Sequence, residues 1–155
     1  MEFSATPVRS FNVYGNLALT DDGYDQLAAG TEAAAAGATQ LPLLSHVQAQ
    51  LGGSWRYQPG LFGRFPVIIA TDWSHRSPYY SDPANSQVGL TTISDRVNAS
   101  VEIQSPDKHW SIVASGRNLN NEKYYSTGLV FSAGYIAAKM PAEEASGMIT
   151  VKYRY

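Results

Sequence analysis

Several absences narrow the chemistry open to this chain of 155 residues. It contains no cysteine, which excludes a disulfide framework, a thiol nucleophile and a cysteine-ligated metal. Charged residues make up only 15% of the chain, compared with about 25% in typical soluble domains. The formal net charge is -2 and no basic run occurs, so the sequence lacks the electrostatic footprint of a nucleic-acid-binding protein.

Long apolar stretches are also missing. No segment approaches the roughly 20 apolar residues of a membrane-spanning helix. The first residues, MEFSATPVRS, lack the basic region and apolar core of a secretory signal. If the chain meets a membrane, strands must therefore cross it.

The pattern that is present is an alternation of apolar and polar residues with a period of two, which is typical of strands. In FNVYGNLALT, for example, Phe11, Val13 and Leu17 share one face. The same pattern predicts strands at 46–57, 65–73, 97–104, 110–117 and 147–155, and a short strand is expected at 2–5. The sequence thus predicts about seven strands. Helix is confined to a turn or two in the alanine-rich segment 27–40.

The predicted connections alternate in length. TPVRS, QPGLFG and SPDKH are short, whereas 21–45, 77–90 and 119–146 are long. An outer-membrane barrel has short turns at one end and long loops at the other. The pattern therefore favours an all-β fold, an antiparallel up-and-down meander with sequential strands paired and the short turns at the same end.

Aromatic residues make up 12% of the chain, and ten of them are tyrosines. They cluster near the ends of the predicted strands, with small residues such as Gly15 and Ala99 between them. Rings with an apolar body and a polar tip suit the headgroup level of a bilayer. The side chains expected at the two membrane interfaces are Phe11, Trp55, Tyr57, Phe65, Trp73, Trp110, Tyr124, Tyr153 and Tyr155.

Alternation alone does not say whether the apolar face meets lipid or a protein core. A soluble β-sandwich or an open-barrel ligand-binding module has the same pattern. If the face meets lipid, it has no second sheet to cover it and should be exposed. The residues expected on that exposed face are Val47, Leu51, Val67, Ile69, Val101, Ile112 and Val151.

An ordered set of motifs resembles one family. The segment DRVNASVEIQSPDKHWSIVASGRNLNNEKYY is similar to the penultimate hairpin of TonB-dependent outer-membrane receptors. YYSDPAN and ITVKYRY resemble the preceding loop and the closing strand, and EFSATPVRSFNVYGNLALTDDGYDQ resembles an earlier strand pair. In the Asn-rich motif, we expect the side chains to cap backbone groups that the strand ladder leaves open.

The family's barrel has about 22 strands around a plugged lumen, so seven strands imply a partial, unclosed barrel. We expect 1–155 to be the C-terminal portion of such a barrel, with Met1 an accidental start and with the plug, the earlier strands and the export signal lying outside the chain. The terminal strand also departs from the family's pattern, because Thr150 stands where a glycine is common.

The resemblance implies uptake of siderophore-bound iron or similar large nutrients at the cell outer membrane. The implied partners are outer-membrane lipid, the plug and remaining strands, and an inner-membrane energy-coupling complex reached through the missing N-terminal part. No cofactor is implied. The polar side chains expected to face the barrel lumen are Gln48, Gln50, Arg56, Asp72, Glu102, Arg117, Lys152 and Arg154.

Enzyme signatures are weak, and no catalytic or metal-binding residue is predicted. Ser105 to Lys108 matches Ser-x-x-Lys, but that motif needs a helix, and Pro106 places these residues in a short turn. The three histidines fall in different segments without metal-ligand spacing. Asn98-Ala99-Ser100 matches a glycosylation acceptor, but it lies within a predicted strand.

Overall fold

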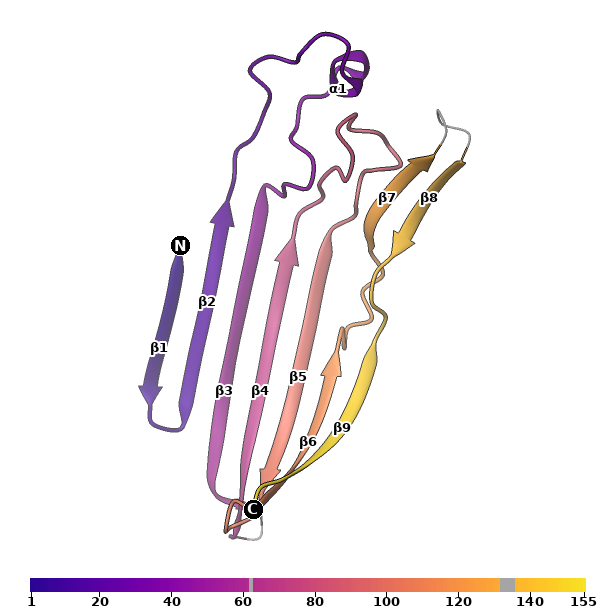
Figure 1. The fold of residues 1–155 in the computed structure, drawn as a ribbon. Helices are drawn as coiled ribbons and strands as arrows, with labels where there is room; N and C mark the ends of the chain where they lie inside the picture. Colours follow the sequence, from indigo (N-terminus) through magenta and orange to yellow (C-terminus); the bar gives the residue numbers. More distant parts are fainter. Residues whose placement is uncertain (62, 132–135) are drawn as a thin grey trace.

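One antiparallel sheet dominates the computed structural model, which describes residues 1–61, 63–131 and 136–155 (Figure 1). Its seven strands lie in the order β1-β2-β3-β4-β5-β6-β9. Their bounds are β1 Glu2–Val8, β2 Phe11–Leu19, β3 Val47–Leu61, β4 Phe65–Arg76, β5 Ser94–Gln104, β6 Trp110–Arg117 and β9 Ser146–Tyr153. The predicted all-β meander of about seven strands is confirmed, and the sheet is open, with β1 and β9 at its two edges.

The connections alternate in length as the sequence predicts. Short turns join β1 to β2, β3 to β4 and β5 to β6, and all lie at the lower end of the sheet in Figure 1. The long connections lie at the opposite end. Of the predicted QPGLFG turn, Phe62 lies outside the described residues.

Two differences concern element boundaries. β1 continues to Val8, beyond the predicted end at Ala5, because its pairing with β2 resumes past an irregularity and Val8 pairs with Phe11. The segment 119–146, expected to be a loop, contains a hairpin of β7 (Tyr125–Phe131) and β8 (Ile136–Pro141). The alternation of apolar and polar residues gives no sign of this hairpin, because GLVF is a continuous run without a period of two.

The predicted helix is present as α1 (Glu32–Ala36) in the connection between β2 and β3. Thr31 caps its start by accepting a hydrogen bond from the amide of Ala34. Gly37 ends it with a φ of 66°, a left-handed conformation that favours glycine. Among the described helices, none is both long and apolar enough to span a membrane.

The register of the sheet brings the apolar positions of successive strands together. Trp55 on β3 pairs with Ile69 on β4, which pairs with Val101 on β5. Val101 pairs with Ala114 on β6, which pairs with Ile149 on β9. This row and its parallel neighbours form one face, which we call the apolar face. The intervening residues form the opposite, polar face.

The apolar face has no second sheet packed on it in the described part of the chain, as a sandwich would require. The additional hairpin β7–β8 lies beyond the end of β6, among the long connections (Figure 1). Buried hydrophobic residues among those described are few: Ala33, Ala38, Val67 and Tyr79. The sheet therefore does not enclose a hydrophobic core of its own.

Candidate functional site

The polar face carries the residues predicted to face a barrel lumen. On β3 to β5, Arg56 shares a row with Glu102, and Gln50 lies one strand from Ser74. Glu102 accepts a hydrogen bond from the Gln104 amide at 3.2 Å, and Gln104 accepts one from Arg56 at 3.4 Å. These polar contacts link β3 to β5 across β4 at the short-turn end of this face.

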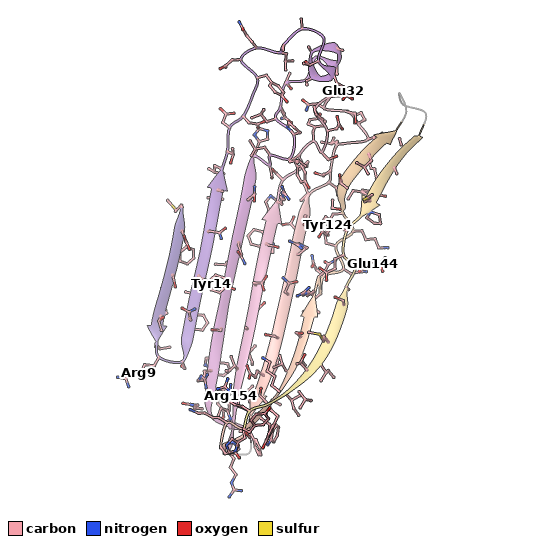
Figure 2. All side chains as sticks on the ribbon, viewed as in Figure 1. Arg9, Tyr14, Glu32, Tyr124, Glu144 and Arg154 are labelled. Atoms are coloured by element: carbon pink, nitrogen blue, oxygen red, sulfur yellow. The ribbon has the colours of Figure 1, made fainter. Side chains whose placement is uncertain are left out.

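The other predicted lumen residues also map to this face. Asp72 accepts a hydrogen bond from the Asn98 amide at 2.8 Å across β4 and β5. Arg117, at the end of β6, lies 3.8 Å from the carboxylate of Glu143. Gln48 pairs with Arg76 and Lys152 with Ser111, and Arg154 follows β9 at the short-turn end, as Figure 2 shows. All the predicted lumen residues thus lie on the polar face. That this face lines a lumen stays a prediction.

Two arginines on the polar face were missed by the sequence analysis. Arg76 ends β4 and Arg96 lies near the start of β5. Both strands extend beyond the predicted limits, 65–73 and 97–104, into polar residues that carry no apolar alternation. Continuing the period of two by three residues past Trp73 would have placed Arg76 on the polar face.

The apolar face is exposed, as predicted for a surface that no second sheet covers. The exposed fractions of Leu51, Ile69 and Val151 are 49%, 40% and 70%. Val101 and Ile112 are exposed as well, and Val47 is half-buried. The expected exposure of Val67 is wrong, since only 7% of it is exposed. It pairs with Tyr57 and Ile103 on the neighbouring strands.

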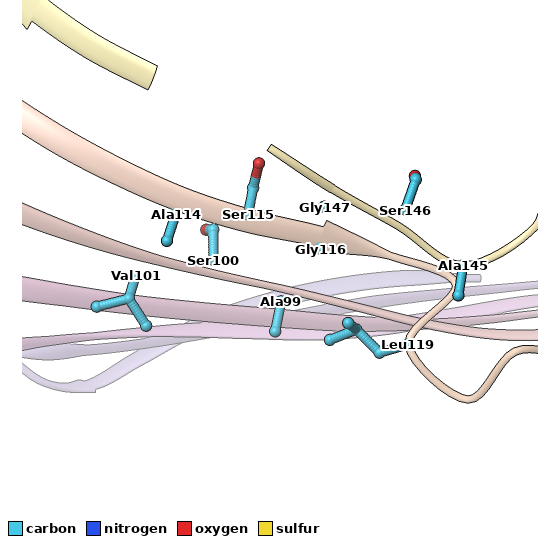
Figure 3. Close-up of a pocket in the computed structure, with 10 residues that line it drawn as sticks. All are labelled: Ala99, Ser100, Val101, Ala114, Ser115, Gly116, Leu119, Ala145, Ser146 and Gly147. Carbon is cyan, nitrogen blue, oxygen red and sulfur yellow. The ribbon is translucent and has the colours of Figure 1, made fainter. Parts of the chain in front are cut away.

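Small residues occupy the middle of the apolar face. Near its edge at β6 and β9 they leave a shallow hollow of about 460 Å³. Figure 3 shows Leu119 and Ala145 on the side of this hollow, whereas Ser115 and Ser146 project from the opposite face. Leu119 folds back over Gly116, where a Cβ would come within 2.5 Å of its Cδ2.

Aromatic side chains gather toward the short-turn end of the apolar face. At the short-turn end, the rings of Phe65 and Trp110 lie 6.2 Å apart, and those of Trp55 and Tyr57 lie 5.5 Å apart. The remaining predicted interface aromatics at this end are Phe11, Tyr153 and Tyr155, all of them exposed. These rings therefore lie together at the short-turn end, and their assignment to a membrane interface stays a prediction.

Fewer of the predicted interface aromatics lie at the long-loop end. Trp73 stacks on His75 with ring centres 6.0 Å apart, and the Nδ1 of His75 lies 2.8 Å from Oδ1 of Asp95. Tyr124 instead lies beside the polar face, with its ring centre 5.6 Å from Cζ of Arg96. Its assignment to a membrane interface stays a prediction.

The Asn-rich segment after β6 caps the sheet and ties down the chain. Asn120 accepts a hydrogen bond from the amide of Val97 and donates one to the carbonyl of Asp95, at 3.0 and 2.6 Å. Asn118 is 1% exposed and donates to the carbonyls of Glu122 and Glu143 at 2.9 and 2.8 Å. The predicted capping of open backbone groups by asparagine side chains is confirmed.

The three long connections contact one another above the sheet. Tyr79 donates its hydroxyl to the carbonyl of Ser126 on β7 at 2.7 Å. The hydroxyl of Ser81 donates to the carbonyl of Gly128 at 2.9 Å and accepts from its amide at 3.0 Å. Asn85 accepts hydrogen bonds from two amides of the connection that follows α1, at 2.9 Å each. The connections therefore form one hydrogen-bonded unit.

The Ser-x-x-Lys match lies in the β5–β6 turn, as predicted. Ser105 is 2% exposed, its hydroxyl donates to the carboxylate of Asp107, and it accepts from the amide of Trp110 at 3.1 Å. The hydroxyl thus has a structural role in the turn. Each histidine lies beside an aspartate, and the described residues hold no group of three or more potential metal ligands.

Comparisons with known proteins identify the fold. No sequence family and no curated protein matches the chain. Among solved structures, the ferric yersiniabactin uptake receptor FyuA from Yersinia pestis matches with a TM-score of 0.74 and 14% sequence identity. The match covers 97% of this chain and 22% of the receptor, so the chain spans about a fifth of the length of that protein. The resemblance to a receptor barrel that the motifs predict is therefore confirmed at the level of the fold.

Proposed function

We propose that this chain forms part of the wall and outer loops of an outer-membrane barrel that takes up siderophore-bound iron or nutrients of similar size. The observation that carries the proposal is the exposed apolar face, with aromatic side chains clustered at its short-turn end, on a sheet that matches an uptake receptor over 97% of the chain. A lipid bilayer would cover that face, and the aromatic side chains would lie at its two interfaces.

The polar face and the loop unit take complementary roles in this proposal. Arg56, Glu102 and Lys152 would line the water-filled or plugged lumen. The long connections would lie outside the cell and contribute to the capture of the nutrient. Strands preceding β1 would complete the barrel, and a plug coupled to an inner-membrane energy source would move the cargo. The chain then acts in transport and not in catalysis.

A chimaera tests the proposal. Residues 1–155 replace the matching part of the ferric yersiniabactin receptor in cells that lack it. We expect a heat-modifiable protein in the outer membrane and measurable accumulation of radioactive iron supplied as ferric yersiniabactin. The matched control is the same chimaera with Val101→Lys, which places a charge on the apolar face and should lower the amount that inserts.

Two outcomes would contradict the proposal. One is a chimaera that stays out of the outer membrane although it is made in normal amount. The other is an inserted chimaera in which Val101→Lys has no effect, because the apolar face would then not meet lipid.

A further inference from the structure

A polar hollow of about 330 Å³ lies on the polar face where β3, β4 and β5 approach the long connections. Amide and hydroxyl groups surround two guanidinium groups there. The polar residues that line it include Asn16, Gln48, Gln50, Ser74, Arg76 and Arg96. Every one of these groups is able to donate a hydrogen bond, and the arginines only donate.

The two arginines are neighbours on one face. Arg76 pairs with Ser94 across β4 and β5, and Arg96 pairs with Ser74. The arginines are therefore diagonal neighbours, a relation that separates side chains by about 7–8 Å and leaves both within reach of one small ligand.

Acidic side chains do not neutralise this pair. Among the described residues, neither Arg76 nor Arg96 has a carboxylate within ion-pair distance. Asp72 is also a diagonal neighbour of Arg96, but it forms no ion pair with either arginine in the described part of the chain and accepts a hydrogen bond from the amide of Asn98 at 2.8 Å. Asp95, next to Arg96 in the sequence, alternates to the apolar face, where it contacts His75 at 2.8 Å. The hollow therefore carries a local excess of positive charge.

The long connections hold the guanidinium group of Arg76 in place. Cζ of Arg76 lies 4.0 Å above the ring of Tyr79, and its Nη2 donates to the carbonyl of Leu43 at 3.4 Å. Tyr79 is itself fixed by its hydrogen bond to Ser126. Two of the three long connections thus contact Arg76 directly, through Leu43 and Tyr79. Because its planar guanidinium group is already ordered, binding of a ligand would cost less side-chain entropy.

From this geometry we propose that Arg76 and Arg96 recognise an oxyanion, a carboxylate or phosphate carried by the imported nutrient. The inference rests on the proposed function, and it names the chemical class of the cargo. Planar guanidinium groups pair with two oxygens of such an anion at once, and the neighbouring amides of Gln48 and Gln50 supply further donors.

The test is calorimetric titration of the chain, refolded in detergent micelles, with citrate as a polycarboxylate and with inorganic phosphate. We expect binding that weakens as NaCl is raised from about 0.05 M to about 0.5 M, because the Debye length falls roughly threefold. Arg76→Gln and Arg96→Gln should each raise the Kd about tenfold or more, as expected for a hydrogen bond to a charged group.

Matched variants separate recognition from folding. Arg56→Gln removes a cation from the same face at the short-turn end and should leave binding unchanged. Arg76→Lys and Arg96→Lys keep the charge and lose the planar fork, so they should weaken binding less than the glutamine variants. No binding of either anion by the wild-type chain, or equal binding by the Arg76→Gln/Arg96→Gln double variant, would overturn the proposal.

The chimaera distinguishes this inference from the proposed function. Loss of insertion or iron uptake together with arginine-dependent citrate binding would refute the transport role and leave the anion site standing. Normal iron uptake by a chimaera whose isolated chain binds neither anion would refute the anion site alone.

Discussion

The ring of Tyr14 lies over Gly52, its partner across β2 and β3 (Figure 2). A Cβ on Gly52 would come within 2.5 Å of both Cζ and the hydroxyl oxygen of Tyr14. On the apolar face, Phe3 lies over Gly15 in the same way, and a Cβ on Gly15 would come within 2.5 Å of Cε1 of Phe3. An aromatic ring that covers a strand glycine compensates for the missing side chain and fixes the register of the pair.

Gly52→Ala should destabilise the sheet by about 1–3 kcal/mol, because the new methyl group overlaps the ring of Tyr14. Guanidinium unfolding of the chain in detergent measures the change. Gly147→Ala is the matched control, since its Cβ would lie 3.8 Å from the closest atom, the carbonyl oxygen of Ser115. In a Tyr14→Ala background the effect of Gly52→Ala should largely disappear, and an undiminished effect there would show that the ring is not its cause.

Asn118→Ala should destabilise the segment after β6 by about 2–4 kcal/mol. The substitution removes the donors to the carbonyls of Glu122 and Glu143 and the acceptor for the amide of Glu122, at a site that water does not reach. Hydrogen exchange should show faster exchange of the Glu122 amide. Asn120→Ala is the control, because its partners lie at an exposed site where water can replace them; equal losses for the two variants would contradict this account.

The β5–β6 turn should weaken in acid. The hydroxyl of Ser105 and the amide and ring of His109 donate to Asp107, and they hold the pKa of its carboxyl below the ordinary value. A carboxyl whose native pKa is lowered stabilises the fold above its unfolded pKa, and this contribution is lost as the pH falls through the native pKa. Carbon-13 titration of Asp107 should give a higher pKa in Ser105→Ala, and an unchanged value would contradict the role of the hydroxyl.

The sequence was sufficient to predict which residues lie on the apolar face and which on the polar face, because the alternation is a property of each strand alone. Trp55, Ile69 and Val101 could each be assigned to the apolar face of its strand before the pairing of the strands was known. That asparagine side chains cap backbone groups was also accessible from their residue type and their place after β6. Their distant partners Val97 and Glu143 were not. Local signals of this kind survive in a single sequence.

Features that depend on distant contacts could not be predicted. The hairpin β7–β8 is held by Ser81, which lies far away in the sequence and bonds both backbone groups of Gly128. Gly128 also lies so close to the carbonyl of Val88 that a Cβ would overlap it. Arg76 and Arg96 become neighbours only through the register of β4 and β5. The ends of these strands carry polar residues without apolar alternation, so the sequence did not predict that the strands reach the two arginines.

Lysine substitutions at adjacent positions of β5 should separate its two faces. Val101→Lys places an ammonium group on the apolar face and should destabilise the chain in lipid vesicles by about 2–4 kcal/mol. Ser100→Lys, one residue away, points to the polar face and should change the stability little. Unfolding of the refolded chain in vesicles measures both, and equal effects would contradict contact of the apolar face with lipid.

The last prediction concerns the edges of the sheet. β1 pairs only with β2 and β9 only with β6 among the described strands, so each leaves a row of backbone amides and carbonyls without a strand partner. The apolar face adds exposed side chains such as Ile149 and Val151, at 76% and 70%. Both features favour association between chains in water.

We therefore expect the chain of 155 residues alone to form broad, concentration-dependent oligomers in detergent-free buffer, as measured by light scattering and sedimentation. Detergent should disperse these by covering the apolar face, and joining the chain to the remaining strands of a receptor barrel should satisfy the edges as well. A matched chain with Val151→Lys on the edge strand should associate less, because an edge charge opposes strand pairing between copies. A sharp, cooperative unfolding transition of a monomer in plain buffer would contradict the open-barrel interpretation, since both edges and the apolar face would then have to be satisfied within this chain.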